Sequence, residues 1–200
     1  MKMDFLPNLE GKKYSVILAD PPWRFIKYSE VDQSRSPENH YDVMNLDDIK
    51  NLPVKNHAMN DCVLLLWATD PLLDKAFEVI NAWGFKFKTV GFYWAKQNIK
   101  SPTFFTGMGY WTRANPEQCL LATIGHPQRK AKNVPRLVVA PRREHSRKPD
   151  EVITRIERLL DGPYLEMFAR QSRPNWDTFG SEINKFDLPS DEFFTLDITV

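Results

Sequence analysis

The feature that most constrains the fold is a short apolar run that ends in an acid and two prolines, Tyr14 to Trp23, with the sequence YSVILADPPW. Its apolar part, Val16 to Leu18, is long enough for one buried strand. Pro21 and Pro22 have a fixed φ and no backbone N–H, so they end the pairing of the strand and stiffen the turn after it. We therefore expect a strand whose C-terminal end presents a carboxylate, a carbonyl group with no competing local donor, and an indole ring. In open α/β sheets, ligands bind at that end.

These groups suit the activation of an exocyclic amine on a flat heteroaromatic ring. The lone pair of such an amine is delocalised into the ring, so the amine is a poor nucleophile. Hydrogen bonds from its two N–H groups to the Asp20 carboxylate and the Pro21 carbonyl would free the lone pair for attack. Trp23 would stack on the ring, and the rigid Pro22 would hold the acceptors in place before the reaction. The alternative is an ordinary Pro-Pro turn after a strand.

The tetrapeptide Asp20 to Trp23 resembles the DPPW signature of amino-methyltransferases that act on adenine. Two later blocks, His145 to Glu151 (HSRKPDE) and Tyr164 to Glu182, extend the similarity to the MT-A70 family of adenine-N6 methyltransferases. This family implies the α/β class: a Rossmann-like S-adenosylmethionine-dependent fold with a central, mostly parallel sheet and helices on both faces. The motif order is permuted, because no Gly-x-Gly-x-x-Gly stands near the N-terminus and the cofactor blocks come last.

The same resemblance implies the residues that bind the cofactor, S-adenosylmethionine. Asp20 orients the amine and meets the cofactor's ammonium group, Lys148 helps hold the cofactor, and Glu182 accepts the ribose hydroxyls. We expect the transfer to be direct, with no metal and no covalent enzyme intermediate. The catalytic residues expected are Asp20, Pro21, Pro22 and Trp23, and the cofactor-binding residues are Ala19, Asp20, Lys148, Arg170, Asn175, Gly180, Ser181 and Glu182. Ser181 stands where nuclear relatives often carry Asn.

Three further stretches are candidates for the nucleic-acid surface. Residues 24–47 form a loop long enough to be a lid, and residues 97–118 interleave aromatic side chains with arginine. Residues 129–148 carry eight basic side chains, which suits a phosphodiester track. For each stretch, packing within the domain or a solvated face is the alternative. The substrate-side residues expected are Tyr41, Tyr110, Trp111, Arg113, Asn115, Arg142, Arg143 and His145.

Length and charge set the remaining expectations. The 200 residues suit one methyltransferase domain, residues 1–185, followed by an acidic tail, residues 186–200. The net charge is only +1, so a nucleic-acid surface must be a local patch. We expect free buried thiols at Cys62 and Cys119, no membrane segment, and a cytoplasmic protein. DNA is favoured as the substrate over RNA. A non-catalytic subunit of a methyltransferase complex is the other alternative, and a homodimer or a protein partner is left open.

Overall fold

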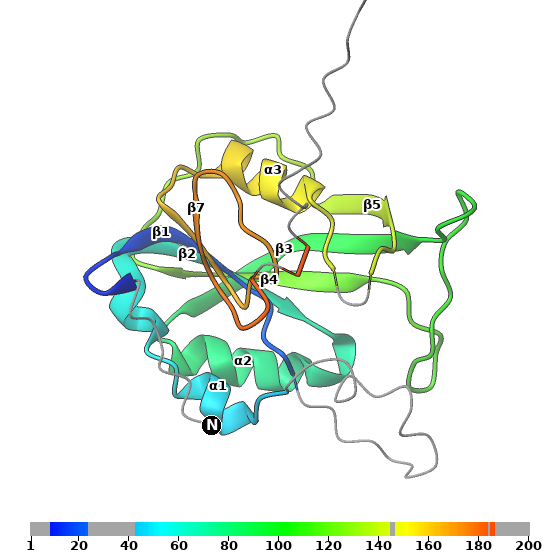
Figure 1. Cartoon of the computed structure of the whole chain (residues 1–200), viewed down its shortest axis with the longest axis horizontal. Helices are drawn as coiled ribbons and strands as arrows, with labels where there is room; N and C mark the ends of the chain where they lie inside the picture. Colours follow the sequence, from blue (N-terminus) through cyan, green and yellow to red (C-terminus); the bar gives the residue numbers. More distant parts are fainter. Residues whose placement is uncertain (1–8, 24–42, 145–146, 184, 187–200) are drawn as a thin grey trace, which may run out of the picture.

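The computed structural model describes residues 9–23, 43–144, 147–183 and 185–186. In this part of the chain, seven strands form one sheet in the order β5-β3-β4-β2-β1-β6-β7 (Figure 1). The strands are β1 (Tyr14–Ala19), β2 (Ala58–Ala68), β3 (Lys86–Gln97), β4 (Glu117–Ile124), β5 (Leu137–Pro141), β6 (Tyr164–Met167) and β7 (Trp176–Phe179). The helices are α1 (Leu46–Lys50), α2 (Leu73–Ala82) and α3 (Glu151–Leu159), with 3-10 turns at Val54–His57 and Asp70–Leu72.

Strand direction explains which residues reach the functional edge of the sheet. β1 runs parallel to β2 and β6, β6 runs parallel to β7, and β3 runs parallel to β5. β4 alone is antiparallel to both of its neighbours, β2 and β3. The carboxyl ends of the parallel strands therefore meet at one edge, and β4 begins at that edge. Asp20, which follows β1, and Glu117, which begins β4, are brought to the same side of the molecule.

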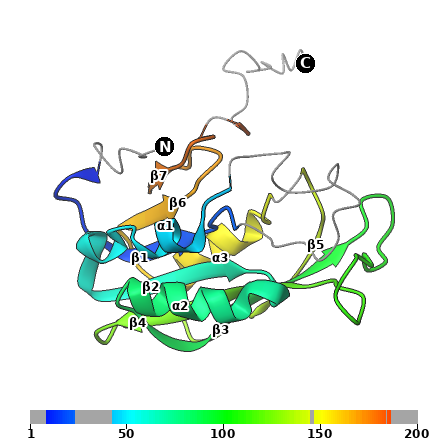
Figure 2. The same ribbon diagram turned by 90° about the horizontal axis from the view of Figure 1, so that it is seen from below.

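Helices cover both faces of the sheet, as expected: α1 and α2 lie on one face and α3 on the other (Figure 2). The apolar run of β1 divides between the two faces because successive side chains of a strand point in opposite directions. Ile17 packs with Ile80 of α2 in one apolar cluster, whereas Val16 packs with Val152 and Ile156 of α3 in the other. The mostly parallel α/β sheet predicted from the sequence is confirmed, with β4 as its antiparallel strand.

One strand of the sheet had no counterpart in the sequence predictions. β5 lies inside the basic stretch of residues 129–148, which we interpreted by its charge. Its Val138 is fully buried beneath α3, and its β-branched run was the signal that a strand was present. Across the described residues we find neither a cluster of metal-ligating side chains nor a helix that is long and apolar enough to span a membrane.

Candidate active site

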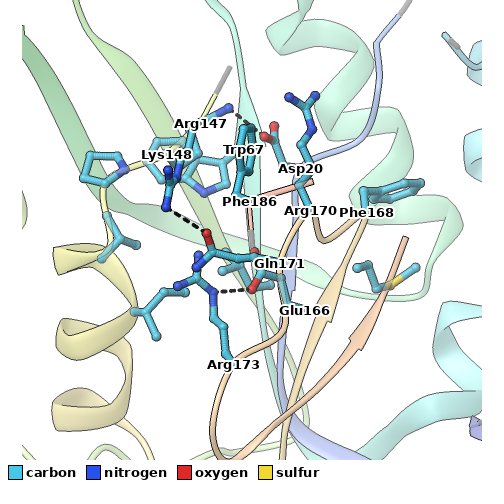
Figure 3. Close-up of a pocket in the computed structure, with 15 residues that line it drawn as sticks. Asp20, Trp67, Arg147, Lys148, Glu166, Phe168, Arg170, Gln171, Arg173 and Phe186 are labelled. Atoms are coloured by element: carbon cyan, nitrogen blue, oxygen red, sulfur yellow. Dashed lines mark hydrogen bonds and ion pairs between the residues drawn. The ribbon is translucent and has the colours of Figure 1, made fainter. Parts of the chain in front are cut away.

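An open pocket of about 550 Å³ lies at the carboxyl edge of the sheet (Figure 3). Its walls come from the ends of β1 and β2, the segment that leads into α3, and the connection between β6 and β7. Two carboxylates line it, Asp20 and Glu166, together with four cationic side chains, Arg147, Lys148, Arg170 and Arg173. A pocket with both signs of charge suits a ligand that itself carries an ammonium and a carboxylate.

A row of four alternating charges joins the pocket to the loop between β3 and β4. The ammonium of Lys148 donates a hydrogen bond to Asp20 Oδ2 at 2.7 Å and lies 3.3 Å from Glu117 Oε2. Glu117 in turn accepts a hydrogen bond from Lys96 at 2.6 Å. The side chains of Lys148 and Glu117 are only 15% and 17% exposed, so solvent screens these contacts weakly. Lys148 also lies 5.4 Å from the ring centre of Trp67, within the range of a cation–π contact.

The ionisation of this row follows from its mutual contacts. Burial alone would raise the pKa of Glu117, but Lys148 and Lys96 outweigh it and lower that pKa to about 2. Burial alone would lower the pKa of Lys148, but Asp20 and Glu117 raise it above its ordinary value. Both groups are therefore charged at neutral pH. The fixed ammonium holds the Asp20 carboxylate in one orientation at the pocket wall.

A second charged group supports the opposite wall. Burial raises the pKa of Glu166, although Arg173 opposes the rise with a 2.7 Å contact. Arg173 also contacts Asp150, 3.1 Å away, and Asp150 contacts Arg143 at 2.5 Å. Arg143 further donates a hydrogen bond to the carbonyl of Lys148. Arg143 therefore fixes the segment that carries Lys148, and its contact with nucleic acid stays a prediction.

The structure corrects two expectations for the turn after β1. Trp23 is 6% exposed, and its indole N–H donates a hydrogen bond to the carbonyl of Trp67 at 3.2 Å. A ring so enclosed offers no face to a base, so the predicted stacking role is wrong and Trp23 anchors the turn to β2. The Pro21 carbonyl does have a local donor, because the Trp23 backbone N–H lies 2.8 Å from it. A carbonyl has two lone pairs, so Pro21 still has one for a second donor.

Substituting Trp23 by Phe tests this structural role. The variant loses the indole hydrogen bond and leaves a small void, so we expect its free energy of unfolding to fall by about 1–2 kcal/mol. The matched control, Trp111→Phe, alters an indole that is fully exposed, and its stability should stay within about 0.5 kcal/mol of the wild type. Urea unfolding of both variants provides the measurement. Equal stability of Trp23→Phe and the wild type would contradict the anchoring role.

The other cofactor-binding residues expected from the sequence divide between the pocket and its supports. Lys148 and Arg170 line the pocket. Glu182 lies beside it, 3.4 Å from Arg170, and it also contacts Lys185. Gly180 permits a close approach of the backbone, because a side chain there would lie 2.1 Å from the backbone carbonyl oxygen of Ala169. The pocket wall does not include Ala19, which is buried within β1, nor Asn175, Gly180 or Ser181.

The expected nucleic-acid residues are also divided. Tyr110, Trp111 and Arg113 are exposed on the loop between β3 and β4. Asn115 instead closes the base of that loop, because its side-chain amide pairs with both the N–H and the carbonyl of Lys96. Tyr41 and His145 lie outside the described residues, as does most of the predicted lid.

Half of the eight basic side chains in this stretch pair with carboxylates of the protein itself, which weakens its interpretation as a continuous phosphate track; they are Lys130, Arg143, Arg147 and Lys148. Lys130 contacts Asp161 at 3.0 Å, and Arg147 contacts Glu144 at 3.3 Å. The guanidinium of Arg142 stacks on Phe105, 3.5 Å from the ring centre. Arg142 therefore packs against the loop between β3 and β4 and lies beside the exposed aromatic side chains of that loop.

Several residues of the site were absent from the sequence-based set: Lys96, Glu117, Trp67, Glu166 and Arg173. Glu166 lies in β6, and Trp67 lies near the end of β2. Both strands end at the pocket, so the position of these residues in predicted strands was the signal by which they could have been identified. Glu117 and Lys96 reach the site because β3 ends where β4 begins, and the direction of β4 is a property of the whole sheet.

Comparison with known proteins identifies one family and several relatives. The MT-A70 family model matches residues 14–182. The type II methyltransferase M.MunI of a Mycoplasma species is 32% identical, over 94% of this chain and 86% of the relative. The catalytic subunit METTL3 of the human N(6)-adenosine-methyltransferase is 31% identical, over 88% of this chain and 29% of the relative. An MT-A70-like N(6)-adenosine-methyltransferase of Arabidopsis thaliana is 30% identical, over 86% of this chain and 24% of the relative. The chain thus spans less than a third of the length of the last two proteins.

Proposed function

Since this chain belongs to the MT-A70 family and is a methyltransferase, we propose that it transfers the methyl group of S-adenosylmethionine to the N6 amine of adenine in DNA. The observation that carries this proposal is the position of Asp20, at the end of a buried strand and in the wall of an open pocket, held by Lys148. DNA is proposed over RNA because the chain covers 86% of the type II methyltransferase but only 29% of human METTL3.

The pocket has the side chains that this cofactor requires. S-adenosylmethionine supplies an electrophilic methyl group on a sulfonium, and it carries an ammonium, a carboxylate and an apolar adenosyl portion. Asp20 and Glu166 are suited to its positive groups, and the cations Lys148 and Arg173 to its carboxylate. The apolar side chains in the wall, among them Leu18, Val152, Ile153 and Met167, complete the fit.

Asp20 and Pro21 then act on the amine of the target adenine. Lys148 contacts one carboxylate oxygen of Asp20, Oδ2, and the other oxygen accepts an N–H of the amine in our proposal. The free lone pair of the Pro21 carbonyl accepts the second N–H. Both acceptors are fixed before the reaction, Asp20 by Lys148 and the turn by the buried Trp23, so little reorganisation accompanies the transfer.

The loop between β3 and β4 is our candidate for contact with the polymer. Tyr110 and Trp111 are exposed aromatic side chains, and Arg113 is an exposed cation between them and the base of the loop. Aromatic rings with an interleaved arginine suit stacking on unpaired bases. The base of the loop is tied to Lys96, which belongs to the charged row that ends at Asp20. A target adenine in a duplex must leave the stack to reach the pocket.

Transfer of labelled methyl groups to matched DNA and RNA oligonucleotides tests the proposal. We expect N6-methyladenine in the DNA after nucleoside analysis, with little label in RNA of the same sequence. Label that appears in RNA alone would replace DNA by RNA as the substrate. A protein that binds the cofactor and labels neither polymer would contradict the proposed function.

A further inference from the structure

The pocket wall includes one side chain from beyond the region that matches the family model. That match ends at residue 182, yet Phe186 lines the pocket. The guanidinium carbon of Arg147 lies 4.7 Å from the centre of the Phe186 ring, which is a cation–π contact. Figure 3 shows the two side chains at the same wall, with Gln171 close to Arg147. We propose that Arg147 and Phe186 form a clamp that retains S-adenosylmethionine in the pocket, an inference that rests on the proposed function.

Three segments that are distant in sequence meet at this clamp. Arg147 precedes α3, and its guanidinium donates a hydrogen bond to the side chain of Gln171 at 3.1 Å. Gln171 and Arg170 belong to the connection that follows β6. The backbone N–H of Phe186 donates to the carbonyl of Arg170, 3.1 Å away. All four residues line the pocket, so the contacts that join the segments also enclose the space in which a cofactor would lie.

The clamp can open without disturbing the fold. Its contacts belong to no strand ladder and to no helix, so their loss leaves the sheet and α3 intact. Opening would separate Phe186 from Arg147 and widen the pocket mouth for cofactor exchange. The clamp is therefore expected to control the rate at which the cofactor leaves, while the methyl transfer itself depends on Asp20.

Arg147 carries a second sign of ligand recognition. Its Nε is buried and has no hydrogen-bond partner among the described residues. A buried N–H without an acceptor destabilises the structure in which it occurs. A ligand oxygen that enters the pocket offers such an acceptor, so binding of the cofactor would relieve this cost and strengthen the closed arrangement.

The test measures release of the cofactor from the full-length protein by stopped-flow tryptophan fluorescence, since Trp67 lines the pocket. The probes are S-adenosylmethionine and S-adenosylhomocysteine. We expect Phe186→Ala to increase the dissociation rate of both by about tenfold, with little change in the association rate. Phe186→Tyr keeps the ring and should retain the wild-type rate, whereas Phe186→Leu should lie between. The control, Phe87→Ala, removes an exposed ring of β3 and should change neither rate.

The outcomes separate this inference from the proposed function. Dissociation from Phe186→Ala at the wild-type rate, or tighter binding by that variant, overturns the clamp, and tighter binding identifies Phe186 as a plug. Wild-type protein that binds the cofactor but methylates no nucleic acid overturns the proposed function and leaves the effect of Phe186 on release measurable. Wild-type protein that binds neither probe overturns both.

Discussion

Replacing Asp20 by Asn is expected to lower the rate of methyl transfer by a factor on the order of 10³, the upper range seen when one preorganised polar contact is lost. The amide keeps the shape of the side chain but removes its negative charge. It also places an NH₂ group where an acceptor is required, beside the ammonium of Lys148. The adenine amine would lose one of its two acceptors, and the positive charge of the cofactor would lose a nearby carboxylate.

Loss of folding should not explain the effect of Asp20→Asn. The Asp20 side chain is 28% exposed, and Lys148 keeps Glu117 as a partner in the variant. Asp70→Asn is the matched control, because Asp70 follows β2 at the same edge of the sheet. Its side chain is exposed and accepts a hydrogen bond from Gln118. We expect that control to retain the wild-type transfer rate. Thermal unfolding and labelled methyl transfer are measured for both variants, and full activity of Asp20→Asn would refute the assigned role.

The sequence predicted those parts of the site that depend on local rules. An apolar run, an acid and two prolines are sufficient to end a strand, so these residues alone place Asp20 at the carboxyl end of β1. Lys148 was placed just before the N-terminus of a helix, which begins at Glu151, and its role toward the cofactor came from the resemblance to the family. Both positions follow from residues within a few places of one another in the chain.

The parts that the sequence did not predict depend on distant residues. The Trp23 ring is turned into the core by a hydrogen bond to Trp67, 44 positions away. Gly180 is required because the backbone of Ala169 lies against it, and only the pairing of β6 with β7 brings the two together. Glu117 reaches Asp20 through Lys148 because β4 is antiparallel. Strand direction and register are global properties, so local patterns could not assign these three roles.

Replacing Glu117 by Gln is expected to reduce the free energy of unfolding by about 2–3 kcal/mol at neutral pH. The change removes the carboxylate that Lys96 contacts, and Asp20, the carboxylate that remains in the row, contacts Lys148. Removing one partner from a buried ion pair commonly costs about 3–5 kcal/mol, and the partial exposure of these side chains reduces that figure. A pKa that falls from 4.5 to about 2 on folding corresponds to about 3 kcal/mol, in agreement.

The pH dependence of this loss distinguishes the charge of Glu117 from its packing. The folded state lowers the pKa of Glu117, so it favours the carboxylate, and the stabilisation is complete above the unfolded pKa of about 4.5. It decreases as the pH falls toward 2, with about half remaining at pH 3. The stability difference between the wild type and Glu117→Gln, measured by urea unfolding, should therefore be about half as large at pH 3 as at pH 6.

Glu78→Gln provides the control for the Glu117 experiment. Glu78 also lies between two lysines, 2.9 Å from Lys75 and 3.3 Å from Lys50, but on the exposed surface of α2. Solvent screens exposed pairs, so this variant should lose much less stability than Glu117→Gln. Equal losses in the two variants, or a Glu117→Gln loss that does not change between pH 6 and pH 3, would show that Glu117 is not the buried charge that fixes Lys148. In that case the orientation of Asp20 would have to come from Lys148 alone.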